Sequence, residues 1–367
     1  MVEWKKIGDI AKCYAGATPS TKNASYWEDG IIPWMSSGEV HQGIVTHTAT
    51  YITQLGYDNS STKMIPKGSI VIALAGQGKT RGSVAITDIE LCTNQSLCGI
   101  VLDKSDIINK YVYYFLGTRY NHLRKISSGE GTRGGLNLKM ISEYEIPIPA
   151  ISEQVRIVGI LDTFTSSIDN LKQQIAQRRK QYEFYRDQLL DLEGKEGVEM
   201  KISDFCLLKA GKSISSDDIY ENRVGNVFPC IGGNGIRGYV SQYSHEGSYP
   251  IIGRQGALCG CVNWITGKFY ATEHAVVATG KENMDQRFIY YLFENADLNH
   301  YKTQGAQPGL SVAKLNEVKF VIPSLSEQQR IVDILDKFES SIQNFEAQLS
   351  QREKQYEYYR NKLLTFE

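Results

Sequence analysis

The chain has 367 residues, with 40 Lys and Arg against 41 Asp and Glu, and a formal net charge of −1. This length predicts two globular units with separate cores, and the balanced charge excludes a protein that grips nucleic acid over its whole surface. No segment approaches the eighteen or so apolar residues of a membrane-spanning helix, and the first residues do not resemble a signal peptide, so we expect a cytoplasmic protein.

Residues 1–150 are predicted to form the first mixed α+β domain. Short β-like runs such as 69–74 are broken by Gly, Asn and Ser, and a helix is expected at 111–120. The sequence AGQGKT from Ala75 follows the first of these strands and resembles the end of a phosphate-binding loop at Gly78, Lys79 and Thr80. Its first glycine is replaced by Ala73, so a glycine-rich loop that approaches a DNA phosphate is the preferred interpretation.

Residues 151–193 are predicted to form a long helix that follows Pro149, with Ser152 as its cap. Its seam positions alternate in steps of three and four, as in a coiled coil, and one of them is an arginine that we expect to fix alignment rather than touch DNA. These positions are Leu161, Phe164, Ile168, Leu171, Ile175, Arg178, Tyr182, Tyr185 and Leu189.

The chain then repeats itself after a polar linker at residues 194–198. A second mixed domain is predicted at 199–324 and a second long helix at 325–367, capped by Ser326 after Pro323. SEQVRIVGILD from Ser152 returns as SEQQRIVDILD from Ser326, and RRKQYEFYRDQLL from Arg178 returns as REKQYEYYRNKLL. The matching seam suggests that the two helices pack on each other as an intramolecular coiled coil that holds the two domains apart. The alternative is that each helix packs only on its own domain.

Polar, glycine-flanked loops occupy related places in the two domains. Arg, Lys, Gln, Asn and His bond base edges, while Ser, Thr and glycine amides suit phosphates, so these loops are the predicted DNA-binding surface. In the first half the candidates are Ser36, Ser37, Glu39, Gln77, Lys79, Thr80, Arg81, Asn94, Gln95, Arg133 and Asn137. In the second half they are Asn234, Arg237, Arg254, Gln255, His274, Gln304 and Gln307.

No catalytic or metal-binding motif stands out. The prolines are never adjacent, which excludes the Pro-Pro-aromatic motif that adenine methylation requires, and neither a nucleophile elbow nor a His-Glu zinc motif is present. The seven cysteines are scattered, with only Cys259 and Cys261 close together, so buried reduced thiols are expected instead of a metal site.

Several of these segments together resemble one family. TPSTKNASYWEDGIIPWMSSGEV from Thr18, IPKGSIVIALAGQGKTRGSVAI from Ile65, NQSLCGIVL from Asn94 and the doubled proline-to-SEQ-RIV junction are similar to type I restriction-modification specificity subunits. The second domain departs from the TPST and SSGEV patterns.

The resemblance implies a non-catalytic subunit with two target-recognition domains, each reading half of a bipartite, asymmetric DNA sequence. It implies that an antiparallel pair of long coiled-coil helices, related by an internal pseudo-twofold, separates the two domains. It also implies two adenine-N6 methyltransferase partners that use S-adenosylmethionine, with possible translocase-endonuclease partners that use ATP and Mg²⁺. At the doubled junction, the candidate partner contacts are Glu153, Gln154, Arg156, Glu327, Gln328 and Arg330. Two other functions remain open: a nucleotide-dependent enzyme using Gly78–Thr80, and a coiled-coil adaptor that binds only protein.

Overall fold

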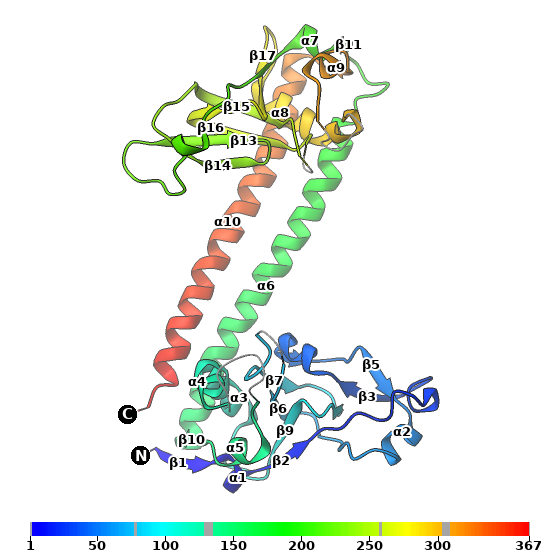
Figure 1. The fold of residues 1–367 in the computed structure, drawn as a ribbon, viewed down its shortest axis with the longest axis vertical. Helices are drawn as coiled ribbons and strands as arrows, with labels where there is room; N and C mark the ends of the chain where they lie inside the picture. The colour runs from blue at the N-terminus through cyan, green and yellow to red at the C-terminus, as the bar shows by residue number, and fades with distance from the viewer. Residues whose placement is uncertain (1, 77–78, 128–134, 257–258, 303–308, 367) are drawn as a thin grey trace. The chain divides into compact units, whose positions relative to one another are not determined.

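The computed structural model describes residues 2–76, 79–127, 135–256, 259–302 and 309–366. Its packing divides into two compact units, unit 1 (residues 1–170 and 349–367) and unit 2 (residues 171–348). Each unit holds one mixed domain of helices and strands together with part of both long helices, so the predicted α+β class with an internal repeat is confirmed (Figure 1).

The domain of unit 1 is built around a sheet whose central strand is buried on both faces. That strand, β6 (Ile70–Ala73), has no exposed side chain, as its unbroken apolar sequence predicts. The sheet order is β2 (Ala11–Ala15), β9 (Leu97–Leu102), β6, β7 (Val84–Thr87) and β4 (Ile44–Val45). Smaller sheets are formed by β5 (Thr50–Ile52), β3 (Ile32–Met35) and β8 (Cys92–Thr93), and by β1 (Glu3–Lys6) with β10 (Glu145–Ile148).

Short helices complete the domain of unit 1, and the longest of them lies within the main core. This helix, α3 (Asn109–Thr118), buries Tyr111, Val112 and Phe115. The others are α1 (Ile7–Ile10), α2 (Gln54–Asp58), α4 (Tyr120–Ile126) and α5 (Leu138–Ser142), with 3₁₀ turns at Ala24–Tyr26 and Ser37–Gln42.

Unit 2 repeats this plan with a six-stranded sheet. Its order is β12 (Cys206–Ala210), β17 (Ala275–Gly280), β15 (His245–Gly253), β16 (Val262–Ala271), β13 (Phe228–Gly232) and β14 (Gly235–Val240). A separate pair joins β11 (Val198–Lys201) to β18 (Lys319–Ile322). The helices are α7 (Ile202–Phe205), α8 (Gln286–Asn295) and α9 (Val312–Asn316), with 3₁₀ turns at Ser216–Asp218 and Leu298–Tyr301, and α8 packs on β15 and β16 (Figure 1).

The caps of the long helices differ from those that the sequence suggests. Helix α6 spans Ile151–Leu190 and α10 spans Leu325–Leu363, so Ser152 and Ser326 lie inside the first turn and are not caps. In α10 the capping oxygen belongs to Ser324, whose hydroxyl accepts the Glu327 amide at 3.4 Å. The equivalent residue before α6 is Ala150, which has no side-chain oxygen to offer.

The two long helices run antiparallel within each unit. In unit 1, Phe164 of α6 stacks on Tyr359 of α10 with ring centroids 5.5 Å apart, and in unit 2, Tyr185 of α6 stacks on Phe338 of α10 at 5.4 Å. Each seam arginine lies 5.7 Å from a ring centroid of the opposite helix, Arg352 over Phe164 and Arg178 over Phe338. The seam is therefore aromatic as well as aliphatic, and its two arginines form cation–π contacts with rings inside the seam.

Candidate nucleic-acid interface

The loops of unit 1 that carry candidate DNA contacts share one hydrogen-bonded stem. The amide of Leu74 donates to Ser96 O at 2.8 Å, and the carbonyl of Leu74 accepts from Leu136 N at 2.8 Å. The amide of Asn94 donates to Met35 O at 3.0 Å, and the amide of Ala17 donates to Thr93 O at 2.9 Å. The loops that follow β2, β3, β6 and β8 are thereby held together next to residue 136.

Unit 2 repeats these four hydrogen bonds. The amide of Arg254 donates to His274 O, and the carbonyl of Arg254 accepts from Leu310 N, both at 2.8 Å. The amide of Thr272 donates to Ile231 O at 2.9 Å, and the amide of Lys212 donates to Ala271 O at 3.1 Å. The expectation that the polar loops occupy related places in the two halves is thus met at the level of individual backbone bonds.

One glycine in each half makes the stem possible. A Cβ atom on Gly16 would lie 2.1 Å from Asn94 O, and one on Gly211 would lie 2.1 Å from Ala271 O. Only a residue without a side chain can bring the chain this close to the neighbouring loop.

The stems match, but the chain between them differs. In unit 1, β3 and its antiparallel partner β5 are separated by residues 36–49, which form a 3₁₀ turn and β4. In unit 2, β13 and its partner β14 are joined by a tight turn at residues 233–234. The same framework therefore presents two differently shaped loop sets.

Several candidate side chains of unit 1 are exposed on these loops. Lys79, Gln95 and Asn137 are exposed, while Asn94 and Thr80 are partly buried. The amide oxygen of Gln95 accepts the hydroxyl of Thr18, and Asn137 caps α5 by accepting Met140 N at 2.9 Å.

Other candidate side chains in unit 1 make contacts inside the domain. Glu39 is buried: its carboxylate accepts the amides of Ser36 at 2.7 Å and Ala49 at 2.8 Å, and Ser36 donates its hydroxyl to it. Arg81 is only 5% exposed, and Ser37 begins the 3₁₀ turn. Glu39 and Arg81 are thus buried in this structure, and their assignment as DNA-binding residues stays a prediction.

In unit 2 the exposed candidates are Asn234, Arg237 and Gln255. Arg254 is half-buried and donates from Nε to Leu310 O at 3.2 Å, so it reinforces the stem. His274 lies 3.2 Å from the carboxylate of Glu273. Gln77, Gly78, Arg133, Gln304 and Gln307 lie outside the described residues.

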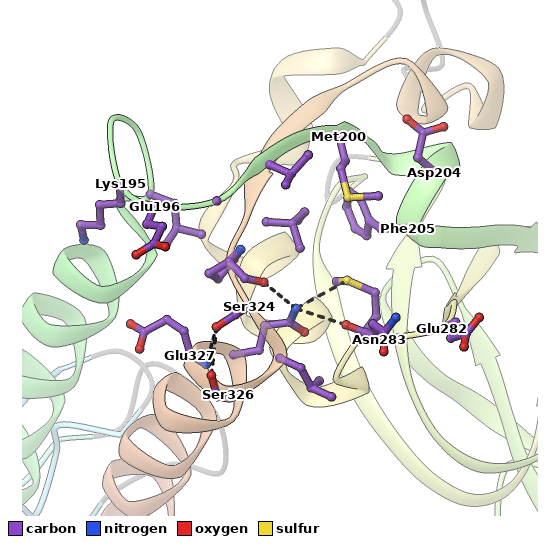
Figure 2. A pocket seen from close by; sticks show the side chains of 18 residues that line it. Lys195, Glu196, Met200, Asp204, Phe205, Glu282, Asn283, Ser324, Ser326 and Glu327 are labelled. Atoms are coloured by element: carbon purple, nitrogen blue, oxygen red, sulfur yellow. Dashed lines mark hydrogen bonds between the residues drawn. The ribbon is translucent and has the colours of Figure 1, made fainter.

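The six candidate partner contacts at the helix starts divide into two kinds. Glu153 with Arg156 and Glu327 with Arg330 are exposed ion pairs at 2.6 and 2.7 Å, and each arginine holds the pKa of its glutamate below the ordinary value. Gln154 and Gln328 are buried, and their side-chain amides form hydrogen bonds inside their own domains. One of the hydrogen bonds drawn in Figure 2 runs from the side-chain amide of Gln328 to the backbone carbonyl of Asn283. Both residues line a pocket beside the start of α10.

The glycine-rich sequence from Ala75 lacks the architecture of a nucleotide site. After Thr80 the chain enters β7 at Val84, whereas a phosphate-binding loop leads into a helix whose amino end faces the phosphate. The interpretation of Gly78–Thr80 as a nucleotide site is therefore not supported by the fold.

A set of contacts between domain and helix escaped the sequence reasoning. Asp162 of α6 accepts the Tyr114 hydroxyl and lies 2.7 Å from the Lys110 ammonium. Asp336 of α10 is bonded in the same way by Tyr291 and Arg287. The signal was present, because KYVYY from Lys110 and RFIYY from Arg287 match, but the acidic partners lie about fifty residues away in the sequence.

Comparison with known proteins identifies the family. The model of the type I restriction modification DNA specificity domain matches residues 1–178 and 195–352, one match for each half. The chain therefore belongs to the type I restriction-modification DNA specificity family. Its role is recognition and not catalysis.

Relatives and solved structures agree with this assignment. The chain is 32% identical over 360 residues to the Escherichia coli type I restriction enzyme EcoprrI specificity subunit, covering 92% of this chain and 88% of the relative. It is 28% identical to the MjaIX specificity subunit of Methanocaldococcus jannaschii, covering 96% and 88%. The type I S subunit of M. genitalium has the same fold, with a TM-score of 0.68 at 18% identity and coverage of 100% and 97%.

Two further properties concern the described part of the chain. None of its helices combines the length and apolarity needed to cross a membrane. Its His, Cys, Asp and Glu side chains form no group of three that could hold a metal ion.

Proposed function

We propose that each domain reads one half of a bipartite, asymmetric DNA target. The supporting observation is that the two units share the same backbone stem but carry different loops. The stem includes the hydrogen bond between Leu136 and Leu74 in unit 1 and the matching bond between Leu310 and Arg254 in unit 2. A duplicated framework keeps the geometry of approach to DNA constant, while altered loops change the bases that are read. Exposed Lys79 and Gln95 in unit 1 and Asn234, Arg237 and Gln255 in unit 2 have side chains suited to base edges and phosphates.

The same proposal assigns the chemistry to partner subunits in the cytoplasm. One structural neighbour, which is 15% identical with a TM-score of 0.63, was solved to explain complex assembly of the type I restriction-modification system. We infer two adenine-N6 methyltransferase subunits, because the ion pairs Glu153–Arg156 and Glu327–Arg330 offer two like surfaces. S-adenosylmethionine would be bound by those subunits, and ATP with Mg²⁺ by any translocase-endonuclease.

The direct test replaces one exposed loop residue in each half. Gln95→Ala is expected to relax recognition of one half-site and Arg237→Ala the other, each costing about 1–3 kcal/mol at the affected base if the contact is bidentate. Methylation by the assembled complex is measured on single-base variants of both halves. Lys180→Ala, on an exposed position of α6, serves as control and should change neither.

Two results would contradict the proposal. Equal loss across both half-sites in each variant would show that the domains do not read separately. Footprinting of the assembled complex without sequence-dependent protection would instead favour an adaptor that binds only protein.

A further inference from the structure

Each domain is attached to its own long helix by a buried glutamine in the first turn. The side chain of Gln154 accepts Ile108 N at 2.9 Å and donates to Pro149 O at 2.9 Å and Asp106 O at 3.1 Å. It therefore links the end of β10, the segment before α3 and the helix itself.

Gln328 makes the equivalent bonds in unit 2. It accepts Asp285 N at 2.9 Å and donates to Pro323 O at 3.0 Å, with a longer contact to Asn283 O at 3.4 Å (Figure 2). Both glutamines are almost completely buried, at 0% and 1% exposed, so these bonds do not compete with water.

A second attachment lies two turns further along each helix. In unit 1, Asp162 accepts the Tyr114 hydroxyl at 2.6 Å and the Lys110 ammonium at 2.7 Å. Both donors lie on α3, so this helix of the domain is held to α6 at two atoms of one carboxylate.

Asp336 holds α8 to α10 in the same way, with additional groups. It accepts the Tyr291 hydroxyl at 2.5 Å and Arg287 Nε at 2.8 Å, and the same guanidinium also bonds Glu339. The Arg287 guanidinium carbon lies 4.7–4.8 Å from the ring centroids of Trp264, Tyr290 and Tyr291. The side chain of Arg287 is 17% exposed, against 45% for Lys110, whereas that of Asp336 is 45% exposed, against 33% for Asp162.

We propose that Asp162 and Asp336, with their tyrosine partners, are positioning residues that fix the number of base pairs between the two half-sites. The inference rests on the proposed function, because it concerns the separation of the two sequences that the domains read. The two glutamines fix the start of each helix, and the two aspartates restrain rotation of the domain about that start. Between these two points, Ile157 and Leu161 of α6 and Ile331 and Leu335 of α10 pack in the core of their own domains, and the aspartates add directional polar bonds to that packing.

The spacer is the quantity that such restraint would control. One added base pair displaces a half-site by about 3.4 Å and rotates it by roughly a tenth of a turn about the DNA axis. A domain held rigidly on its helix cannot follow both changes unless the DNA deforms, which carries an energetic cost. A domain with a loosened attachment can follow them.

The experiment uses the full chain assembled with its methyltransferase and S-adenosylmethionine. DNA duplexes carry the target with its natural spacer or with one base pair more or fewer, and methyl transfer to each half is measured. The variant is the pair Asp162→Ala with Asp336→Ala, and the matched control is Glu183→Ala with Glu357→Ala, exposed acidic residues at equivalent places on the same helices.

The native protein is expected to favour one spacer by about tenfold or more, and the aspartate variant by about threefold or less. The control pair should keep the native ratio. Asp162→Asn with Asp336→Asn, which retains an oxygen for the tyrosine hydroxyls, should restore part of the selectivity. If the alanine pair does not fold, Tyr114→Phe with Tyr291→Phe removes only the hydroxyl bonds and gives the decisive ratio.

The possible failures are distinguishable. A native ratio in folded variants, or a uniform loss of activity at every spacer length, overturns the positioning role and leaves DNA reading intact. Equal broadening in the glutamate control also overturns it. Absence of any sequence-dependent methylation by the native complex contradicts the proposed function itself.

Discussion

At the scale of single residues, two cysteines on neighbouring strands of the unit 1 sheet differ sharply in acidity. Cys13 lies on β2 and Cys98 on β9, and these strands pair antiparallel. A hydrogen bond from the Cys98 thiol lowers the pKa of Cys13 to about 7, while the same contact and burial raise the pKa of Cys98. The thiolate of the pair therefore resides on Cys13, above about pH 7 and not below it.

Alkylation should report this difference. The rate of Cys13 modification by iodoacetamide is expected to rise with pH around a midpoint near 7, because only the thiolate attacks. Cys98→Ala removes the hydrogen-bond donor and should move the midpoint upward, toward the value of about 8.5 for a free thiol. Peptide mapping by mass spectrometry follows the reaction.

Cys98→Ser provides the control for this experiment, because it keeps a donor at the same place and should keep a low midpoint. A midpoint that is unchanged in Cys98→Ala would show that the hydrogen bond does not set the acidity of Cys13.

Residue type predicts what a side chain can bond but not whether it faces solvent. Gln95 and Arg237 were assigned to the surface by their loops, and the structure places both there. Glu39 was assigned by its loop and Gln154 by the doubled junction at the helix start, yet both accept backbone amides in the interior. A buried amide or carboxylate that bonds its own backbone has the same local sequence as one that bonds a ligand, so only the fold separates them.

At the scale of elements, the seam between the long helices combines rings with arginines. Tyr185 stacks on Phe338, and Arg178 lies over the same ring. Tyr359 and Arg352 make the equivalent contacts with Phe164. Such aromatic pairs stabilise by about 0.5–1.5 kcal/mol beyond the area they bury.

Truncating either central ring should therefore destabilise its unit. Phe338→Ala and Phe164→Ala are each expected to lower the free energy of unfolding by about 2 kcal/mol, less than the roughly 3–5 kcal/mol of a fully buried ring, because both are partly exposed. Urea unfolding followed by circular dichroism measures the change. Phe184→Ala, at a ring that is 62% exposed, should cost under about 0.5 kcal/mol; an equal cost would mean that the stacks do not stabilise the seam.

Periodicity predicted the two long helices well, because a heptad stripe over forty residues has few alternative structures. Their capping residues were harder to predict. Ser324 and Ser326 are both plausible caps, and the choice depends on where β18 ends at Ile322. The sequence also did not predict that residues 36–49 in unit 1 correspond to a tight turn at 233–234 in unit 2. The alternation of apolar and polar residues along a strand does not identify the strand with which it pairs.

At the scale of the whole molecule, recognition and catalysis belong to different chains, so assembly is part of function. The exposed ion pairs at the two helix starts are candidates for the shared contact. Each pair lies on one helix at a spacing of three residues, and such surface pairs contribute little to folding. Their arginines can therefore be replaced without unfolding the chain.

Reversing both charges tests the assembly surface. Arg156→Glu with Arg330→Glu is expected to leave the fold intact and reduce methyltransferase occupancy, as measured by native mass spectrometry. Lys180→Glu with Lys354→Glu, the same double charge reversal at equivalent exposed positions of the two long helices, should keep both partners. Full occupancy in the double variant would mean that the two arginines serve only their neighbouring glutamates.

The two ring stacks have a consequence for ancestry and symmetry. Phe164 corresponds to Phe338 and Tyr185 to Tyr359, so the stacks Phe164–Tyr359 and Tyr185–Phe338 are one contact made twice with the helices exchanged. A polypeptide ending after Leu190 would already contain both members of that contact. Two such polypeptides could close the same seam as a homodimer, and two identical reading domains would select a palindrome. Fusion of two such halves, followed by divergence of their loops, would permit the asymmetric target proposed above.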